Sequence, residues 1–307
     1  MLVYVTGASG FVGRHVVETL RDGGADVREA RVDLLDGAGL ERVMRGCEAV
    51  VHVAALYSYD APDAALERVN VDGTRTVLEA AARAGVRRLI HTSTAGTCGP
   101  VAGRRATEAD RMPPWEQSVP YKRTKLAAER LALVAGAVVV NPTAPLGAGD
   151  DRPTPTGRMV AGVARRRLRG YLAGTGLNVV DVRDVAVGHA LALEHGRAGQ
   201  RYLLGGVDLV LEDLFARIAA LAGVARPRVR VPYALARAAG AAGLVNRNEV
   251  RLARLPMFFD SAKAERELGY RARPVETALR LSVREALSRP ACRAATARAE
   301  PAIPSRM

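Results

Sequence analysis

The sequence lacks the features that mark secreted, metal-binding and membrane-spanning proteins. Its three cysteines, Cys47, Cys98 and Cys292, are widely spaced, with no Cys-x-x-Cys or His pairing, so we expect reduced thiols and no metal site. No stretch approaches the roughly 20 consecutive apolar residues of a membrane-spanning helix. A signal peptide has a positively charged segment followed by an apolar one, and the N-terminus shows no such pattern. We therefore expect a cytoplasmic globular protein with no membrane span.

Lysine is also scarce, although the chain is strongly basic. Only three lysines occur among 45 basic residues, so arginine supplies nearly all of the net charge of +13. A compositional preference for arginine on the surface is our first interpretation, and attraction of an anionic small molecule or nucleotide is the second. The densest run, 165–169, is predicted to lie on a helix over 157–169. No aromatic residues interleave with it, so no nucleic-acid partner is expected.

The first half of the chain alternates between strand and helix patterns. The apolar strand at 49–53 is typical of a parallel sheet covered on both faces. Together the segments predict an α/β fold with a doubly wound parallel sheet. Only nine residues separate Gly24 from Leu34, which leaves room for one strand, so we expect one edge strand to be missing. Strands are predicted at 2–5, 27–32, 49–53, 88–92 and 137–141, and helices at 11–20, 39–45, 71–84 and 121–134.

A glycine-rich turn, 6–13, joins the first predicted strand to the first helix. Its glycines stand at the three positions where a side chain would block a tight turn, a pyrophosphate or close helix packing. The amides that open the helix would bind the pyrophosphate of a dinucleotide, helped by the helix dipole. Asp33, 20 residues beyond Gly13, has the spacing of the acid that binds the ribose 2′-hydroxyl of NAD. Arg28 and Arg31 would instead suit the 2′-phosphate of NADP, so both cofactors stay open.

The second half is less regular. Proline and glycine crowd residues 142–155, and beyond them helices are predicted at 157–169, 211–222 and 232–242, with a short strand at 229–231. We expect residues 1–150 to form a dinucleotide-binding core, to which about 172–205 return, and residues 151–287 to form a small α+β substrate lid. Residues 288–307 are rich in Ala, Arg and Pro without apolar periodicity, which predicts a disordered tail.

Tyr121 and Lys125 stand four residues apart on a predicted helix, so both project from one face. A nearby ammonium favours the phenolate, and we expect Lys125 to lower the pKa of Tyr121, so that the phenol can exchange a proton with a hydroxyl or carbonyl. Eight tyrosines and three lysines in 307 positions give about 0.08 such pairs by chance. Thr92-Ser93-Thr94 follows a predicted strand at the end where open α/β sheets bind ligands, although a merely polar strand end is the alternative.

Together these motifs resemble the extended short-chain dehydrogenase/reductases, the NAD-dependent epimerase/dehydratase group, over roughly residues 1–287. Within that group the chain is most similar to hopanoid-associated sugar epimerase-like proteins, and next to dihydroflavonol 4-reductase-like proteins, on segments 122–125, 141–145, 152–158 and 257–260. The matching family segments are 6–13, His52-Val53-Ala54-Ala55, Asn70-Val71-Asp72-Gly73-Thr74, Thr92-Ser93-Thr94-Ala95-Gly96, Tyr121-Lys122-Arg123-Thr124-Lys125 and Asn141-Pro142-Thr143.

The resemblance implies a Rossmann-type fold and an enzyme that uses NAD or NADP for hydride transfer at a secondary alcohol or ketone. Tyr121 would be the general acid/base, Lys125 would hold the nicotinamide ribose and Thr94 would orient the substrate. The implied substrate contacts are Tyr57, Arg158 and Asn178, with Tyr59 and Tyr171 as further pocket residues. The implied cofactor contacts are Gly7, Ser9, Gly10, Phe11, Val12, Gly13, Arg31, Asp33, Leu34, Val53, Ala54, Ala55, Asn70, Thr92, Pro142 and Thr143.

Several alternatives stay open from the sequence. Net reduction and epimerisation of a small molecule such as a sugar nucleotide use the same residues, although Cys98 stands where sugar epimerases often carry tyrosine. A dinucleotide-sensing regulatory or binding protein without turnover is the alternative from another class. Family members are often dimers, so a homodimer is compatible with the resemblance.

Overall fold

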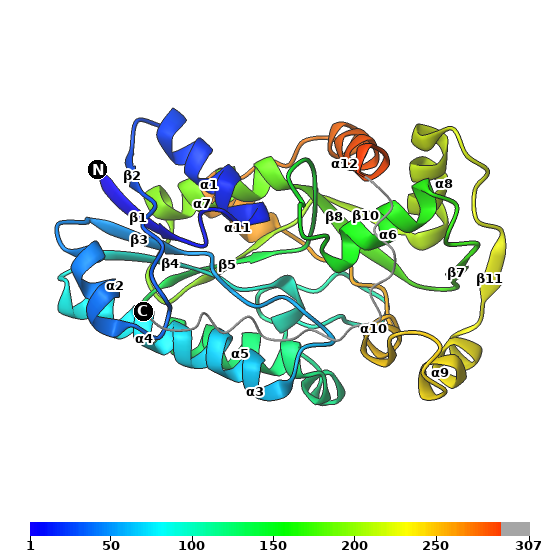
Figure 1. The fold of residues 1–307 in the computed structure, drawn as a ribbon, viewed down its shortest axis with the longest axis horizontal. Coiled ribbons are helices and arrows are strands. Elements are labelled where there is room, and N and C mark those ends of the chain that lie inside the picture. Colours follow the sequence, from blue (N-terminus) through cyan, green and yellow to red (C-terminus); the bar gives the residue numbers. More distant parts are fainter. Residues whose placement is uncertain (290–307) are drawn as a thin grey trace, which may run out of the picture.

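The computed structural model describes residues 1–289, and its centre is a parallel sheet of six strands in the order β2-β1-β3-β4-β5-β9 (Figure 1). Every neighbouring pair in this sheet is parallel. Within the described residues β2 is an outermost strand, which confirms the predicted doubly wound sheet with one edge strand missing. The strands are β1 Leu2–Thr6, β2 Asp26–Arg28, β3 Ala49–His52, β4 Arg88–Thr92, β5 Val138–Pro142 and β9 Arg201–Leu204.

Helices cover both faces of this sheet (Figure 1). On β1, Val3 and Val5 pack with α1 residues in one core cluster, whereas Tyr4 joins a second cluster with Leu40 of α2, because successive strand side chains point to opposite faces. One face carries α1 Phe11–Asp22, α7 Val182–His195 and α11 Ala262–Leu268, and the other carries α2 Gly37–Met44, α4 Gly73–Arg83 and α5 Pro120–Val134.

A second unit, which we call the lid, lies beyond the carboxyl ends of the central strands (Figure 1). A three-stranded sheet, β10-β8-β6, and a two-stranded sheet, β11-β7, form its strands. Helices α6, α8 and α12 pack together over its own hydrophobic core. The lid elements are β6 Ala144–Leu146, α6 Pro155–Ala164, β7 Gly170–Leu172, β8 Gly176–Asp181, β10 Val207–Val210, α8 Leu211–Ala222, β11 Val229–Val231, α9 Tyr233–Ala241, α10 Arg247–Leu252 and α12 Glu276–Ser288.

The predicted helix over 157–169 was wrong at its end. Helix α6 stops at Ala164, and Arg166 adopts a left-handed conformation with φ of 58°. The side chain of Arg165 donates to the carbonyls of Ala286 and Arg289, and the amide of Leu168 turns back to the carbonyl of Gly162. The arginine run therefore follows the helix and leads into β7.

Four other predictions differ from the structure. The strand predicted at 27–32 ends at Arg28, because charged residues follow on an edge strand that has one partner only. The helix predicted at 71–84 is preceded by α3, Asp63–Leu66, and by a π-helical turn, Glu67–Asp72. The predicted loop 142–155 contains β6. Helix α12 extends to Ser288, and the rest of the predicted tail, 290–307, lies outside the described residues.

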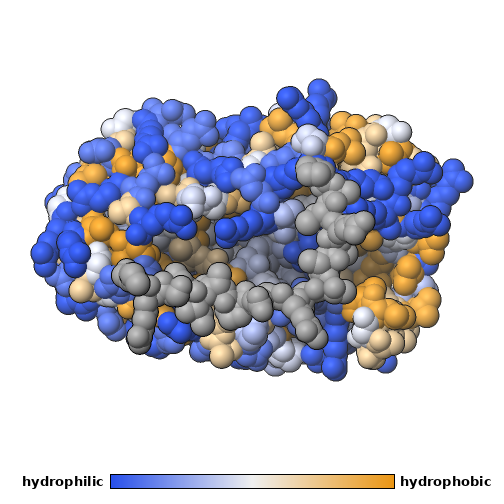
Figure 2. All heavy atoms as spheres, in the orientation of Figure 1, coloured by the Kyte–Doolittle hydropathy of each residue, from blue (hydrophilic) through white to orange (hydrophobic). Residues whose placement is uncertain are grey.

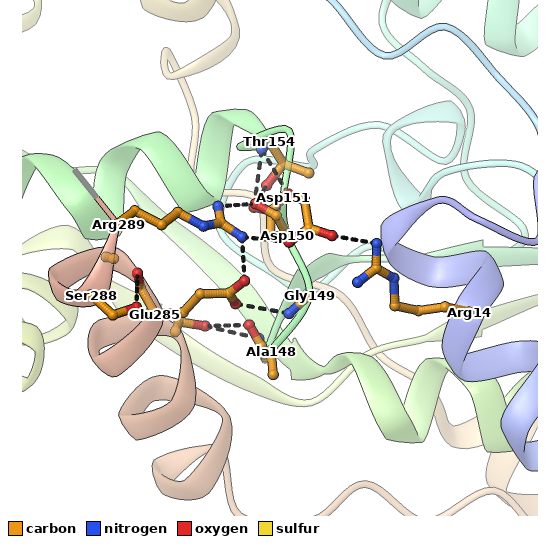
Figure 3. A network of polar contacts seen from close by, with 12 residues as sticks. Arg14, Ala148, Gly149, Asp150, Asp151, Thr154, Glu285, Ser288 and Arg289 are labelled. Carbon is orange, nitrogen blue, oxygen red and sulfur yellow. Dashed lines mark hydrogen bonds and ion pairs between the residues drawn. The ribbon is translucent and has the colours of Figure 1, made fainter. Parts of the chain in front are cut away.

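The loop between β6 and α6 is fixed to both α1 and α12 (Figure 3). Arg289 donates to the carbonyl of Asp150 at 2.5 Å and to the carboxylate of Asp151 at 2.9 Å. Arg14 of α1 forms an ion pair with the same Asp151, and Glu285 of α12 accepts from the amide of Gly149 at 2.8 Å. The lid is thereby attached beside the helix that opens at the glycine turn.

The close packing of α1 on the glycine turn is testable by substitution. A Cβ on Gly13 would lie 2.0 Å from the carbonyl oxygen of Gly7, whereas a Cβ on Gly23, at the other end of α1, would meet its nearest atom at 3.5 Å. We expect Gly13→Ala to lower the free energy of unfolding by about 1–3 kcal/mol through overpacking. Gly23→Ala is the matched control and should change it by less than about 1 kcal/mol. Urea unfolding followed by circular dichroism measures both, and equal losses would contradict this packing.

Candidate active site

The glycine turn leaves an open cradle of amides at the start of α1. Gly7 has φ of +69°, and a Cβ there would lie 2.8 Å from Cα of Ala54, so glycine is required by both conformation and space. A Cβ on Gly10 would meet only the carbonyl of Gly7, at 3.1 Å, and Ser9 and Gly10 are exposed. Because α1 carries no acidic side chain in its first turn, its amino end favours an anion such as a pyrophosphate.

A chain of hydrogen bonds joins this turn to β3 and the segment after it. The amide of Ala54 donates to Oγ1 of Thr6 at 3.2 Å, and Thr6 lies 2.7 Å from Nδ1 of His52. Thr74 donates to the carbonyl of Asn70, so Nε2 of His52 must donate to Thr74, 3.1 Å away, and Nδ1 accepts from Thr6. Burial lowers the pKa of His52 to about 3, which keeps the ring neutral. The chain fixes Val53–Ala55 beside the cradle.

Asn70 connects the same segment to the helix that carries Tyr121. Its amide oxygen accepts from the Leu56 amide at 2.8 Å, and its Nδ2 donates to the Leu56 carbonyl and to Oγ1 of Thr124, both at 3.1 Å. The side chain is buried and all of these partners are protein groups. Asn70 therefore positions the segment after β3 against α5.

The residues that the sequence predicts at the adenosine end of a cofactor lie in the loop after β2. Asp33 is exposed, and one of its carboxylate oxygens accepts from the Leu35 amide at 3.0 Å. Arg28 donates to the carbonyls of Val43 and Arg45, at 2.5 and 3.1 Å, so its guanidinium is held at the end of α2. Arg31 is exposed and is the arginine of this loop that extends into solvent. Leu34 packs against the α2–α4 cluster.

Tyr121 and Lys125 are both buried on α5. Nζ of Lys125 donates to the carbonyl of Thr92, at the end of β4, at 2.7 Å. Burial lowers the pKa of Lys125 to about 8. Burial, together with the neighbouring Tyr57, raises the pKa of Tyr121 well above its usual value. The predicted lowering of this pKa by Lys125 is therefore wrong, because loss of water around the buried phenol disfavours the charged phenolate.

The rings of Tyr57 and Tyr59 form an aromatic cluster with the ring of Tyr121. The ring of Tyr57 lies 4.6 Å from that of Tyr121 in a tilted arrangement, and Tyr59 meets Tyr121 edge-on at 5.6 Å. Tyr57 is 41% exposed, so it stands at the opening of the cluster. From the lid, Asn248 of α10 donates to the carbonyl of Tyr59 at 3.1 Å. Lid and core therefore meet at the segment that covers Tyr121.

Among residues 1–289, the Thr94 hydroxyl near the end of β4 accepts a hydrogen bond and donates none. Thr94 is half-buried and caps a 3₁₀ turn, Ala95–Thr97, by accepting from the Gly96 amide at 3.3 Å. Since that contact uses a lone pair, the hydroxyl can still donate to a substrate oxygen. Within residues 1–289, the neighbouring Ser93 hydroxyl is buried with no hydrogen-bond partner. Thr92, Ser93 and Thr94 therefore do not form a strand end that is simply exposed to solvent.

Thr92 holds the end of β4 against α7. Its hydroxyl lies 2.8 Å from Nε2 of His189, whose Nδ1 donates to the carbonyl of Val185 at 2.7 Å. Since a carbonyl can only accept, Nδ1 carries the proton and Thr92 donates to Nε2. Burial lowers the pKa of His189 to about 4, so the ring is neutral. The carbonyl that binds Lys125 is positioned by this contact.

A buried ion pair supports the Thr94 turn from below, and our sequence reasoning missed it. Nζ of Lys122 lies 2.7 Å from a carboxylate oxygen of Glu116 and donates to the carbonyl of Gly96 at 2.9 Å. A Cβ on Gly96 would lie 2.1 Å from that Nζ. Glu116 lies on a 3₁₀ turn, Pro114–Ser118. The scarcity of lysine was a usable signal, because Lys122 and Lys125 are both buried beside this site.

A second buried network, also missed, lies behind Thr94. Glu129 accepts from Thr97 at 2.6 Å, from Asn141 at 2.7 Å and from Arg201 at 2.9 Å. Asn141 also donates to the carbonyl of Thr94 at 3.1 Å. These residues come from four separate elements, so no local pattern in the sequence links them. Together they hold the 3₁₀ turn against β5 and β9.

The other predicted residues fall into different surroundings. Pro142 ends β5, and the Thr143 amide that follows donates to the carbonyl of Leu204 at 3.2 Å. Arg158 is exposed and pairs with Glu249 of α10 at 3.0 Å. Asn178 is buried, with its amide bonded to Asp208 and to the Gly206 amide.

Tyr171 does not lie beside the predicted catalytic pair. It is buried in the lid core, with its ring 6.3 Å from that of Phe215. Its ring packs against Phe215 of α8 in the lid core, so Tyr171 is not part of the aromatic cluster with Tyr121. Of the tyrosines proposed to line a pocket, Tyr57 and Tyr59 lie next to Tyr121.

In the described chain no helix has the length and apolar composition to cross a bilayer, and no cluster of three or more His, Cys, Asp or Glu side chains could hold a metal ion. The polar groups brought together here are instead a tyrosine, a lysine and hydroxyls beside an anion cradle. This set suits acid/base chemistry next to a bound dinucleotide.

Comparison with known proteins gives matches across the chain. Residues 3–205 match the model of the NAD dependent epimerase/dehydratase family. A relative from Synechocystis sp., provisionally named dihydroflavonol 4-reductase, is 35% identical over 315 residues, which cover 90% of this chain and 92% of the relative. Sterol demethylase protein B of Methylococcus capsulatus is 34% identical over 256 residues, 76% of this chain and 78% of that protein.

Among solved structures, a nucleoside-diphosphate-sugar epimerase from Pseudomonas aeruginosa superimposes with a TM-score of 0.79. The two chains are 27% identical, and the alignment covers 93% of this chain and 97% of the epimerase. The likeness extends over both the central sheet and the lid. It confirms the Rossmann-type fold predicted from the sequence.

The buried ion pair under the Thr94 turn predicts a large loss of stability when one charge is removed. Glu116→Gln leaves Lys122 as an uncompensated buried cation, so we expect the free energy of unfolding to fall by about 3–5 kcal/mol. Replacing both charges with apolar residues, Glu116→Leu with Lys122→Met, should recover most of the lost free energy of unfolding. Glu276→Gln removes an exposed pair with Arg217 and should cost less than about 1 kcal/mol. Similar losses for Glu116→Gln and Glu276→Gln in urea unfolding would refute the assignment.

Proposed function

The chain belongs to the NAD dependent epimerase/dehydratase family, and from this premise we propose that it reduces a ketone on an apolar ring compound, or oxidises the corresponding secondary alcohol. It is an NAD(P)-dependent enzyme, as the family and its relatives are. The observation that carries the proposal is the aromatic cluster of Tyr57, Tyr59 and Tyr121, because a group of aromatic rings favours a flat apolar substrate beside the phenol.

The relatives support a ring compound as substrate. The names of the two relatives described above refer to a flavonol and a sterol, both of which contain fused rings. The groups that would recognise a sugar diphosphate are less favourably arranged here, because Arg158 is paired with Glu249. Cys98, at the position where sugar epimerases often have tyrosine, is buried, and burial raises the pKa of its thiol to about 12. Epimerisation of a sugar nucleotide is therefore our second candidate.

The glycine turn fits a dinucleotide, because glycine at position 10 leaves space over the open amides at the start of α1. In our proposal Ser9 to Gly13 hold the pyrophosphate, Asp33 or Arg31 holds the adenosine ribose and Val53–Ala55 line the nicotinamide ribose, with Thr92, Pro142 and Thr143 beside the ring. When bound, the dinucleotide supplies or accepts the hydride. We assign residues 1–150, with about 172–205, to cofactor binding and the lid, about 151–287, to substrate binding.

The phenol of Tyr121 would act as the proton donor in reduction. Its raised pKa keeps it protonated near neutral pH, the form needed to protonate a carbonyl oxygen as that oxygen gains negative charge. The Thr94 hydroxyl, whose proton is free, would donate a hydrogen bond to the same oxygen. Lys125 would bind ribose hydroxyls and stabilise the phenolate that remains. Proton transfer in the opposite direction would serve alcohol oxidation.

Two outcomes distinguish this reaction from its alternatives. A reductase consumes reduced cofactor in proportion to the ketone converted, whereas an epimerase regenerates its cofactor in each cycle. Absorbance of the reduced cofactor, followed with a panel of cyclic ketones and sugar nucleotides, separates the two. Binding of NAD or NADP with no turnover on either class would favour the dinucleotide-sensing protein.

Tyr121→Phe tests the proposed proton donor. We expect kcat to fall by about 10²–10⁴-fold, because the carbonyl oxygen would no longer receive a positioned proton. The dissociation constant of the cofactor should stay within about twofold, since Tyr121 is assigned no part in cofactor binding. Tyr171→Phe, in the lid core, is the matched control and should leave kcat unchanged. Full turnover by Tyr121→Phe would show that the mechanism is wrong.

The pKa of Lys125 predicts the pH dependence of the free enzyme. Because burial lowers this pKa to about 8, the ammonium is lost as pH rises through that value, and kcat/KM for reduction should decline above about pH 8. The raised pKa of Tyr121 places phenol ionisation at higher pH. In Lys125→Arg, kcat/KM should no longer decline above about pH 8, because a guanidinium stays charged. A profile of the parent enzyme that stays flat to about pH 10 would contradict this role.

A further inference from the structure

The end of the lid away from the central sheet is strongly basic. We call residues 165–172 and 224–256 the arginine-rich tip, and β7 and β11 pair within it. Its only acidic residue is Glu249, which already forms an ion pair with Arg158 at 3.0 Å. The second of the two segments contains Arg226, Arg228, Arg230, Arg237, Arg247, Arg251 and Arg254.

The same tip exposes apolar side chains. Leu235 on α9 is 62% exposed, and Leu244 and Val245, in the turn between α9 and α10, are 78% and 47% exposed. One side of α9, which we call its outer side, carries only apolar side chains that are exposed. They are Ala234, Leu235, Ala238 and, just after the helix, Ala242. Figure 2 shows this apolar surface over α9, with hydrophilic surface above it. The outer side of α9 is therefore apolar and bordered by cations.

The opposite side of α9 borders a basic cavity. Tyr233, Arg237 and Gly240 of α9 face it, and a cavity of about 370 Å³ separates them from α10 and Trp115. The guanidinium of Arg254 stands over the Trp115 ring at 5.7 Å. The remaining arginines of the lining are Arg247 and Arg251. Guanidinium groups around a recess of this size match the fixed negative charge of a phosphate group.

The positive charge of the arginine-rich tip favours one kind of partner for the apolar side of α9. A second copy docked by two-fold symmetry would bring the same arginines face to face, and like charges disfavour that contact. A protein partner would favour exposed aromatic anchors, whereas the exposed large side chains here are leucine and valine on a short helix and its turn. Apolar side chains bordered by arginine are the pattern of elements that lie in the headgroup region of an anionic bilayer.

We propose that the arginine-rich tip docks reversibly on an anionic lipid bilayer. Leu235, Leu244 and Val245 would enter the boundary between headgroups and acyl chains, and exposed arginines of the tip, such as Arg237 and Arg247, would bind lipid phosphates. This association needs no membrane-spanning helix and does not depend on the proposed function. Through α10, whose Asn248 contacts Tyr59, docking would place the opening at Tyr57 on the membrane side of the protein.

Sedimentation of the full chain with vesicles tests the proposal. We expect binding to vesicles of equal parts phosphatidylcholine and phosphatidylglycerol, at least about tenfold weaker binding to phosphatidylcholine alone, and release at high salt. Leu244→Ser with Val245→Ser, and separately Arg237→Gln with Arg247→Gln, should each weaken binding about tenfold or more. Circular dichroism and cofactor affinity should match those of the parent, which shows that the variants fold.

Val134→Ser with Arg87→Gln is the matched control, because it removes an apolar side chain 89% exposed and an exposed arginine far from the tip. It should bind vesicles as the parent does. Equal binding to neutral and anionic vesicles, no vesicle binding, or tip variants that bind like the parent would each overturn the proposal. A dimer seen by light scattering and dissociated by the tip variants would assign the surface to a second copy instead.

Discussion

The site depends on one hydrogen bond, from the buried ammonium of Lys125 to the carbonyl of Thr92 at 2.7 Å. It ties α5 to the end of β4, and because Tyr121 lies one turn earlier on α5, it also sets where the phenol stands. Burying an ammonium is unfavourable, and the lowered pKa of Lys125 reflects that cost. The surrounding network therefore has to hold the carbonyl in place, and His189 does so through the Thr92 hydroxyl.

The parts predicted well from the sequence are those governed by neighbours along the chain. The glycine turn, the alternation of strands and helices, and helix α8 at 211–222 depend on local spacing and were confirmed. Partners far apart in the chain were missed, as with Glu129, Asn141 and Arg201 behind Thr94. Their residue types do not indicate which distant groups the fold brings together, so only the structure shows the support of the site.

Two wrong predictions have the same origin. The helix over 157–169 was expected from its residues, but Arg165 bonds to carbonyls at the end of α12, and the chain leaves the helix there. The pKa of Tyr121 was expected to fall because Lys125 is one turn away, but burial raises it. In both cases the sequence showed the local preference correctly, and the tertiary environment, which it does not reveal, outweighed that preference.

Arginine has two different settings in this protein. Over the central sheet many arginines pair with acids, as Arg21 does with Glu29, Arg45 with Glu41 and Arg75 with Asp72, which agrees with arginine simply replacing lysine on an ordinary surface. The tip differs because its single acid is already paired and because exposed leucine and valine lie in the same segment as seven arginines. The lid is held to the core at Asp151 and again at Tyr59, so it stands on both sides of the site. A partner bound at the tip would therefore contact α10, the element whose Asn248 donates to the carbonyl of Tyr59 in the aromatic cluster.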